Sequence, residues 1–290
     1  MEIRKVPAAA GAEWLLDAFR LLKKSPMGFG LLAVIYAVLW LIVVLVSGAA
    51  PEMAKVLQLV FIVIGPLLMA GMIFAAHEVA EGRSAAPAHL LASIRTGKAA
   101  RLLTTLIPQF AVLFLIFGLL FVMVGQENIE KLSALMLKIQ AEAQTGGQVD
   151  PQLFLDLPAG RLFLWMVLAL GIGFLSLLLT LTVVPDMLFN DVRLVPAMKR
   201  SFTACVRNLP ALIVFMVLAF VILFAAGIGG GIVIGIAQLV FGQTATLVGN
   251  ALMNGFFICF IAGAMYFAWK QMLGTVGDAT AAAEPPGVAM

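Results

Sequence analysis

The sequence predicts an all-α integral membrane protein, in which six transmembrane helices form three repeated units of a cytoplasmic amphipathic helix and a transmembrane hairpin. Three observations support this fold class. First, the 290 residues are 63% hydrophobic and 11% charged, whereas soluble domains carry about 25% charged residues. Second, long uncharged runs divide the chain. Third, short amphipathic segments of similar composition precede pairs of these runs.

Six uncharged runs are long enough to cross a bilayer. About 20 helical residues, each rising about 1.5 Å, span a hydrocarbon core of roughly 30 Å. The runs cover residues 27–47, 56–76, 102–125, 162–184, 211–241 and 246–269. The fifth is too long for one perpendicular helix, so we expect it to tilt, bend or break near Gly229-Gly230-Gly231, or to be a span followed by a re-entrant segment.

The distribution of Lys and Arg predicts the orientation of the spans. With the N-terminus in the cytoplasm, fourteen of these residues lie in cytoplasmic segments and four in external segments, as the positive-inside rule requires. Both termini are therefore predicted to be cytoplasmic. The net charge of +3 reflects this topology, and the absence of a basic patch interleaved with aromatic residues predicts no nucleic-acid partner. We interpret the first run as a retained span, because it is longer than a leader's apolar region of about 7–15 residues.

The repeated unit begins with an amphipathic helix. In the stretches 14–26 and 195–210, apolar residues at helical spacing lie opposite basic residues, and a proline precedes the next span. A weaker copy lies at 87–101. The sequence AGMIFAAHE at 70–78 also aligns without gaps with AGAMYFAWK at 262–270. We place the three units near residues 10–79, 87–184 and 195–274. In the last amphipathic stretch we expect an apolar stripe of Met198, Phe202, Cys205, Val206 and Leu209.

The chain is predicted to be one polytopic membrane domain over residues 1–274, with a disordered cytoplasmic tail at 275–290. The largest external segment is a loop at 126–160, which is expected to be periplasmic. Within it, residues 128–144 have the spacing of an amphipathic helix. This helix is the best candidate for contact with a periplasmic partner, and lying on the outer rim of the bundle is the alternative.

The chain is similar to a family of uncharacterised multi-pass inner-membrane proteins of proteobacteria. The segments that carry this resemblance are VPAAAGAEWLLDAFRLLKKSP, GPLLMAG, MKRSFTACVRNLPALIVF and GAMYFAWKQML. More distantly, the helix-then-hairpin pattern resembles the membrane domain of some bacterial glycerophosphodiester phosphodiesterases. The resemblance implies a helical bundle in the bacterial inner membrane. It brings no established activity, cofactor or catalytic residue.

Residues suited to catalysis or metal binding are scarce. The two histidines, His77 and His89, and the two cysteines, Cys205 and Cys259, do not have metal-ligand spacing. No nucleophile–base pair or carboxylate dyad is evident, and no charged residue lies at mid-depth in a predicted span. We therefore expect no enzymatic activity, cofactor or metal. In the segment 185–191, acidic residues lie near the basic helix at 199–207, which favours local charge pairing over a metal site.

The leading functional hypothesis is a non-enzymatic protein that organises anionic lipids or envelope partners. Each Lys or Arg close to an anionic surface contributes about 1 kcal/mol of binding free energy. The candidate headgroup ligands are Arg95, Lys98, Arg101, Lys199, Arg200 and Arg207. Positive-inside topology would place basic residues on this side even if lipid recognition were not a function.

The alternative is a passive channel or small-solute transporter with a path between the repeats. Its candidate residues are Gln238, Asn250, Asn254, Gly227, Gly231 and Gly235. The two asparagines lie one turn apart on the sixth span, where they would line a cavity or form cross-helix hydrogen bonds. The three glycines recur every four residues and suit tight packing within the chain, a homo-oligomer interface or a gating hinge.

Overall fold

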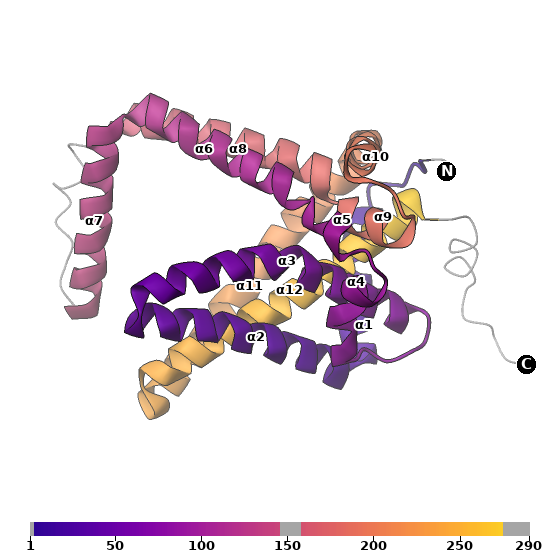
Figure 1. Cartoon of the computed structure of the whole chain (residues 1–290), viewed down its shortest axis with the longest axis horizontal. Coiled ribbons are helices and arrows are strands. Elements are labelled where there is room, and N and C mark those ends of the chain that lie inside the picture. The colour runs from indigo at the N-terminus through magenta and orange to yellow at the C-terminus, as the bar shows by residue number, and fades with distance from the viewer. Residues whose placement is uncertain (1–2, 146–157, 275–290) are drawn as a thin grey trace, which may run out of the picture. The chain divides into compact units, whose positions relative to one another are not determined.

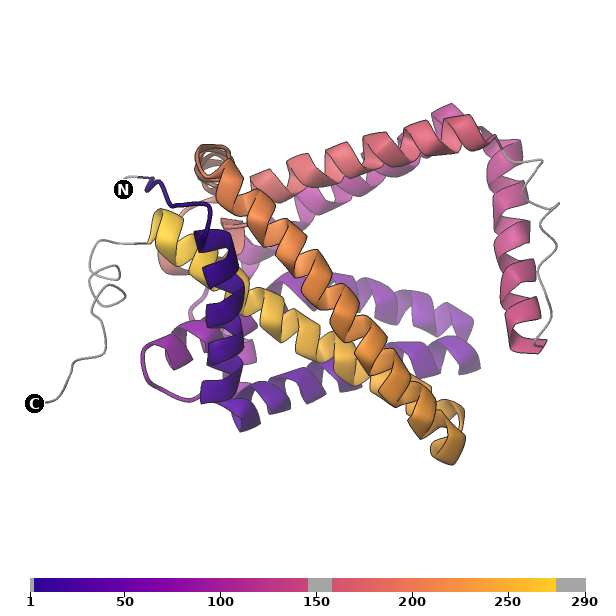
Figure 2. The same cartoon turned by 180° about the vertical axis from the view of Figure 1, so that it is seen from behind.

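A computed structural model describes residues 3–145 and 158–274, and every regular element in these two ranges is helical (Figures 1 and 2). Six helical segments are long and apolar enough to cross a membrane. They are Pro26–Ala49, Glu52–Ala80, Ala99–Val124, Ala159–Phe189, Leu209–Phe241 and Gln243–Leu273. The all-α prediction and the six apolar helices are thus confirmed.

The elements in chain order are α1 (Ala10–Lys24), α2 (Pro26–Ala49), α3 (Pro51–Ala80), η1 (Pro87–Leu91), α4 (Ala92–Arg95), α5 (Ala99–Leu103), α6 (Leu106–Val124), α7 (Gln126–Thr145), α8 (Ala159–Thr180), α9 (Val183–Phe189), α10 (Leu194–Arg207), α11 (Leu209–Phe241) and α12 (Gln243–Leu273). Their contacts divide the chain into two units. The first comprises residues 1–106 and 178–290, and the second comprises 107–177.

In the first unit, the short helices α1, η1, α4, α5, α9 and α10 gather at one end, together with the N-terminal segment and the end of α12 (Figure 1). We call this the short-helix end. The α2–α3 and α11–α12 turns lie at the opposite end of the unit (Figure 1). The two described ends of the chain therefore lie at the same end of the first unit (Figure 1). An even number of membrane spans between them would give this result.

Close backbone approach holds the core of the first unit together. A Cβ on Gly255 of α12 would overlap the backbone carbonyl oxygen of Ala33 in α2, and one on Gly11 of α1 would overlap that of Ala211 in α11. Helix α1 is anchored by Trp14, which is fully buried and donates a 2.8 Å hydrogen bond from Nε1 to Gln271 Oε1. Small residues let helix backbones approach closely where the bilayer supplies no hydrophobic driving force between helices.

Helix α11 is a single element of 33 residues that continues through Gly229-Gly230-Gly231. Of the alternatives expected for this run, a break, and with it the re-entrant segment, is excluded, and a single tilted or bent helix remains. Glycine lowers helix propensity by only about 1 kcal/mol, and the flanking isoleucines and valines keep the segment apolar. A helix of this length extends about 50 Å, so in a bilayer it must tilt or project beyond the hydrocarbon core.

The second unit contains α6, α7 and most of α8. Trp165 Nε1 of α8 donates a 3.0 Å hydrogen bond to the carbonyl oxygen of Ile116 in α6. Gly125, with a φ of 81°, lets the chain turn from α6 into α7. Residues 128–144, which were predicted to be helical, lie within α7. An apolar pocket of about 900 Å³ lies between α6 and α7. The predicted tail at 275–290 lies outside the described residues, as does part of the loop at 126–160.

Candidate functional site

A buried carboxylate joins three helices at the short-helix end. Asp186 of α9 is fully buried. Its Oδ1 lies 3.2 Å from an Arg200 guanidinium nitrogen of α10 and accepts hydrogen bonds from Trp269 Nε1 at 3.2 Å and Asn190 Nδ2 at 2.7 Å. The local charge pairing predicted between 185–191 and 199–207 is confirmed by the Asp186–Arg200 pair. No cluster of three or more His, Cys, Asp or Glu side chains suited to a metal occurs among the described residues.

Aromatic rings pack around this pair. The Phe189 ring centroid lies 4.9 Å from both the His77 and the Trp269 ring centroids. His77 Nδ1 is 3.2 Å from the Tyr266 hydroxyl oxygen, which joins α3 to α12. His77 therefore takes part in a packed aromatic cluster with a polar contact.

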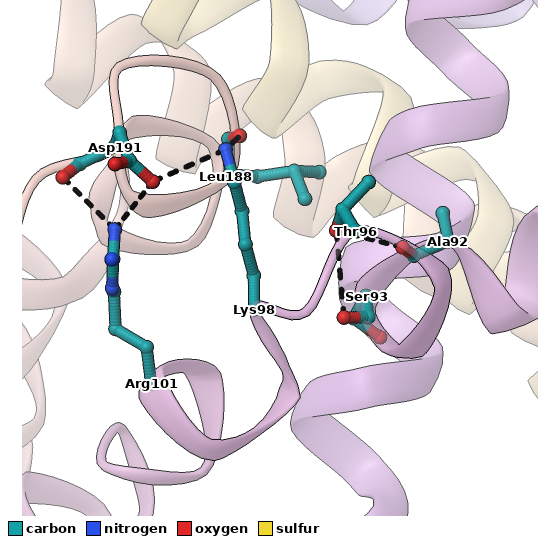
Figure 3. A network of polar contacts seen from close by, with 7 residues as sticks. All are labelled: Ala92, Ser93, Thr96, Lys98, Arg101, Leu188 and Asp191. Carbon is teal, nitrogen blue, oxygen red and sulfur yellow. Dashed lines mark hydrogen bonds and ion pairs between the residues drawn. The ribbon is translucent and has the colours of Figure 1, made fainter.

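A second ionic network connects α5 and the residues before it to the turn between α9 and α10 (Figure 3). Arg101 donates to the Asp191 carboxylate at 2.6 Å and to its backbone carbonyl oxygen at 2.9 Å. Lys98 Nζ donates to the Leu188 carbonyl oxygen at 2.6 Å and lies 3.4 Å from the Asp191 carboxylate. Hydrogen bonding by Arg101, followed by that of Lys98, holds the pKa of the Asp191 carboxyl below its usual value.

The two networks divide the six predicted headgroup ligands into two groups. Lys98, Arg101 and Arg200 each lie within 4 Å of a carboxylate. Arg200 has the buried Asp186 as its counter-charge, whereas Lys98 and Arg101 share the one carboxylate of Asp191, so these three cations face two carboxylates. The other three are exposed, and their side chains have no hydrogen bond or ion pair with any residue that the structure describes. These exposed cations are Arg95, Lys199 and Arg207.

Helix α10 has a packed face of small residues. Ala197, Ser201, Ala204 and Cys205 are buried. Ser201 Oγ donates to the Leu178 carbonyl oxygen at 3.0 Å and accepts from the Thr182 N–H at 3.3 Å. Burial also raises the pKa of the Cys205 thiol to about 11, so little of the reactive thiolate forms at neutral pH.

The opposite face of α10 is both apolar and basic. Val195 and Val206 are 59% and 48% exposed, and Phe202 is also exposed. Lys199 and Arg207 are exposed with them. The predicted stripe is therefore split, since Cys205 points inward while Phe202 and Val206 point outward. Small side chains take the inner face because α10 packs directly against the backbone at the α8–α9 junction.

The other two amphipathic segments have the same two-sided character. On α1, Trp14 and Leu15 are buried, whereas Leu16 and Phe19 are exposed beside Lys23 and Lys24. On α4, Ile94 is 56% exposed and is followed by the exposed Arg95. Sequence reasoning placed the α1 lysines on a polar face but omitted them from the site. Their position directly before a span, as in α10, was the signal that could have identified them.

His89 has a structural contact at the start of η1. Its Nδ1 accepts a 3.2 Å hydrogen bond from the Ala86 N–H. Burial lowers the pKa of the His89 imidazole, while Glu78 opposes this shift. A neutral ring is also what this contact requires, because Nδ1 must be unprotonated to accept a hydrogen bond.

The residues proposed for a channel path lie largely at the surface. Gln238 and Asn254 are exposed, Asn250 is half-buried, and none of the three has a hydrogen-bonding partner among the described residues. Of the two alternatives for Asn250 and Asn254, cross-helix hydrogen bonds are therefore not formed within the first unit. The rotation of each helix about its own axis determines which residues meet the partner helix of a hairpin. Here these amides lie beside the line along which α11 and α12 make contact.

The glycine stripe of α11 is also open. A Cβ on Gly227, Gly231 or Gly235 would meet no described atom within 4 Å. Tight packing of this stripe against the other helices of the first unit is therefore contradicted. Instead, the α11–α12 contact uses Gly230, where a Cβ would lie 2.6 Å from Met253 Sδ, and Gly249, where it would lie 2.6 Å from Ile234.

Comparisons with protein-family models, curated proteins and solved structures gave no match for this chain.

Proposed function

We propose that the chain is a non-enzymatic protein of the bacterial inner membrane, and that its short-helix end binds anionic lipid headgroups and thereby organises lipids or envelope partners. The observation that carries this proposal is the outward face of α10. There, exposed Val195, Phe202 and Val206 accompany exposed Lys199 and Arg207, immediately before the apolar helix α11.

An apolar face with basic neighbours is the composition of a helix that lies in the membrane interface. Transfer of exposed valine and phenylalanine side chains into the acyl boundary is favourable. The approach of lysine and arginine side chains to phosphate groups is favourable as well. Two cations at about 1 kcal/mol each contribute about 2 kcal/mol, or roughly 30-fold in affinity. The outward residues of α1 and α4 extend the same composition to two more segments.

The proposal places the short-helix end and both termini in the cytoplasm. Its support is the charge asymmetry of the sequence, with fourteen Lys and Arg on that side and four on the other. Anionic lipids of the inner leaflet would then face Lys199, Arg207 and Arg95 directly.

We also propose that three repeated units underlie the architecture. The support is a cyclic series of contacts in which the second span of each unit meets the amphipathic segment of the next. A Cβ on Gly71 of α3 would lie 2.5 Å from Leu90 Cα of η1, and one on Gly263 of α12 would lie 3.2 Å from Ala18 Cβ of α1. The third contact is the 3.0 Å hydrogen bond from Ser201 of α10 to Leu178 of α8. Gly71 and Gly263 are the residues that the internal alignment equates.

Charge reversal on α10 tests the proposed function. The variant Lys199→Glu/Arg207→Glu is expected to bind phosphatidylglycerol at least tenfold more weakly than the unmodified protein, because two attractive contacts of about 1 kcal/mol each become repulsive. Binding of phosphatidylcholine should be unchanged. Native mass spectrometry during lipid titration of the detergent-solubilised protein measures both affinities.

The matched control is Lys55→Glu/Lys138→Glu. It changes the net charge equally, and both of its lysines are exposed residues on the predicted external side. Equal loss of phosphatidylglycerol binding in the two double variants, or no loss in either, contradicts the proposal.

A further inference from the structure

An apolar groove of about 390 Å³ lies among α1, α11 and α12, which run close together in Figure 2. Its lining includes Leu15, Leu16, Phe19, Leu218, Ile222 and Phe260. Two of its three walls, α11 and α12, are helices long and apolar enough to cross a membrane. In a bilayer the groove would therefore be reached from the acyl-chain region, and α1 would form its edge toward the short-helix end.

A cation lies at this edge. Lys23 Nζ is 4.7 Å from the centroid of the Phe19 ring, and that ring lines the groove. Among the described residues Lys23 has no carboxylate partner, whereas Arg20 of the same helix is paired with Asp17 at 2.8 Å. The groove thus combines an entirely apolar lining with a lysine that has no internal counter-charge.

We propose that this groove binds one acyl chain of an anionic phospholipid, whose phosphate lies at Lys23. The site lies on α1, away from Lys199 and Arg207. This proposal rests on the proposed function only in that both take an anionic lipid as the ligand. The apolar lining matches an acyl chain, and Lys23 matches a phosphate. An apolar groove with one cation at its edge is therefore complementary to a lipid that has an apolar acyl chain and an anionic phosphate.

The size of the groove favours a lipid over a partner helix. One turn of helix, about 5.4 Å long and at least 10 Å in diameter, occupies roughly 420 Å³, about the volume of the whole groove, so a partner helix could place little more than one turn in it. Small-molecule sites have volumes of about 300–1,000 Å³. The groove falls within this range, so a single flexible chain is the occupant that its volume accommodates.

Filling the groove tests the proposal. Ile222→Trp adds bulk inside it, whereas Val217→Trp adds the same side chain at a 56% exposed position of α11 that does not line it. The probes are palmitoyl-oleoyl phosphatidylglycerol and palmitoyl-oleoyl phosphatidylcholine, which have identical chains, and native mass spectrometry counts the lipids retained. We expect Ile222→Trp to weaken retention of one phosphatidylglycerol at least tenfold, and Val217→Trp to change it by less than about twofold.

Two further variants keep the test decisive. If Ile222→Trp does not fold, Leu16→Trp fills the groove from an exposed position of α1 and should have the same effect. Lys23→Gln should lower the preference for phosphatidylglycerol over phosphatidylcholine about fivefold, as expected for one lost cation. Equal retention in the groove-filling and control variants overturns the proposal, as does an unchanged lipid preference in Lys23→Gln.

The α10 variant separates this inference from the proposed function. Lys199→Glu/Arg207→Glu should leave the single tightly retained lipid in place while weakening the other anionic lipids. Loss of lipid binding in that variant, with none in the groove-filling variants, overturns the groove and leaves the proposed function standing. The reverse pattern overturns the proposed function and leaves the groove standing.

Discussion

Replacing Arg200 with methionine is expected to lower the free energy of unfolding by about 3–5 kcal/mol. Asp186 would remain fully buried without its cationic partner, and among the described residues the hydrogen bonds from Trp269 and Asn190 are the ones that would still stabilise its charge. Methionine preserves much of the aliphatic bulk of arginine, so the loss reports mainly the uncompensated carboxylate. Unfolding of the purified protein in mixed micelles of increasing denaturing-detergent content measures the change.

Two controls define this result. Lys199→Met removes an exposed cation from the same helix and should change stability by less than about 0.5 kcal/mol. Asp186→Asn/Arg200→Met removes both charges while leaving a carbonyl oxygen for Trp269, and should recover most of the loss. If Arg200→Met is no more destabilising than Lys199→Met, the buried pair does not have the role that its geometry indicates.

Replacing Gly255 with valine is expected to destabilise the protein by at least the roughly 1–3 kcal/mol typical of overpacking. A Cβ at this position would overlap the carbonyl oxygen of Ala33 in α2, and backbone atoms cannot rotate away as a side chain can. The helices α2 and α12 would have to separate along their closest contact. Thermal unfolding followed by circular dichroism measures the loss.

Gly231→Val is the matched control, because a Cβ on Gly231 would meet no described atom within 4 Å. We expect its unfolding temperature to stay close to that of the unmodified protein. Similar destabilisation by the two substitutions would show that helix propensity, rather than close backbone approach, determines the cost. It would also contradict the open position assigned to the glycine stripe.

Hydropathy was sufficient to locate the six apolar helices, because the length of about 20 residues is set by the bilayer and not by tertiary contacts. The positions of α1, α7 and α10 were also predictable, since each has apolar residues at helical spacing. The continuity of α11 was not, because three adjacent glycines permit a break without requiring one.

The inward face of α10 could not be predicted from hydrophobicity. In a soluble protein Phe202 and Val206 would be the buried residues, yet here Ser201 and Ala204 are buried. The proposed position of α10 beside a membrane accounts for this difference, because burying a large apolar side chain in the protein would gain little over leaving it in lipid, whereas small residues permit close contact. The pairing of Lys98 and Arg101 with Asp191 was also missed, because it joins residues about ninety positions apart that only the tertiary fold brings together.

The depth of α10 in a bilayer is the most direct test of the proposed lipid contact. A nitroxide attached at Val206→Cys can be placed selectively, because the native Cys205 and Cys259 are buried and react slowly. In bilayers containing phosphatidylglycerol, we predict that the nitroxide collides with membrane-soluble oxygen and lies at the headgroup level, with greater immobilisation as the anionic lipid fraction rises. A nitroxide reached only by a water-soluble nickel chelate, whatever the lipid composition, would place this face of α10 in water and contradict the proposed lipid contact.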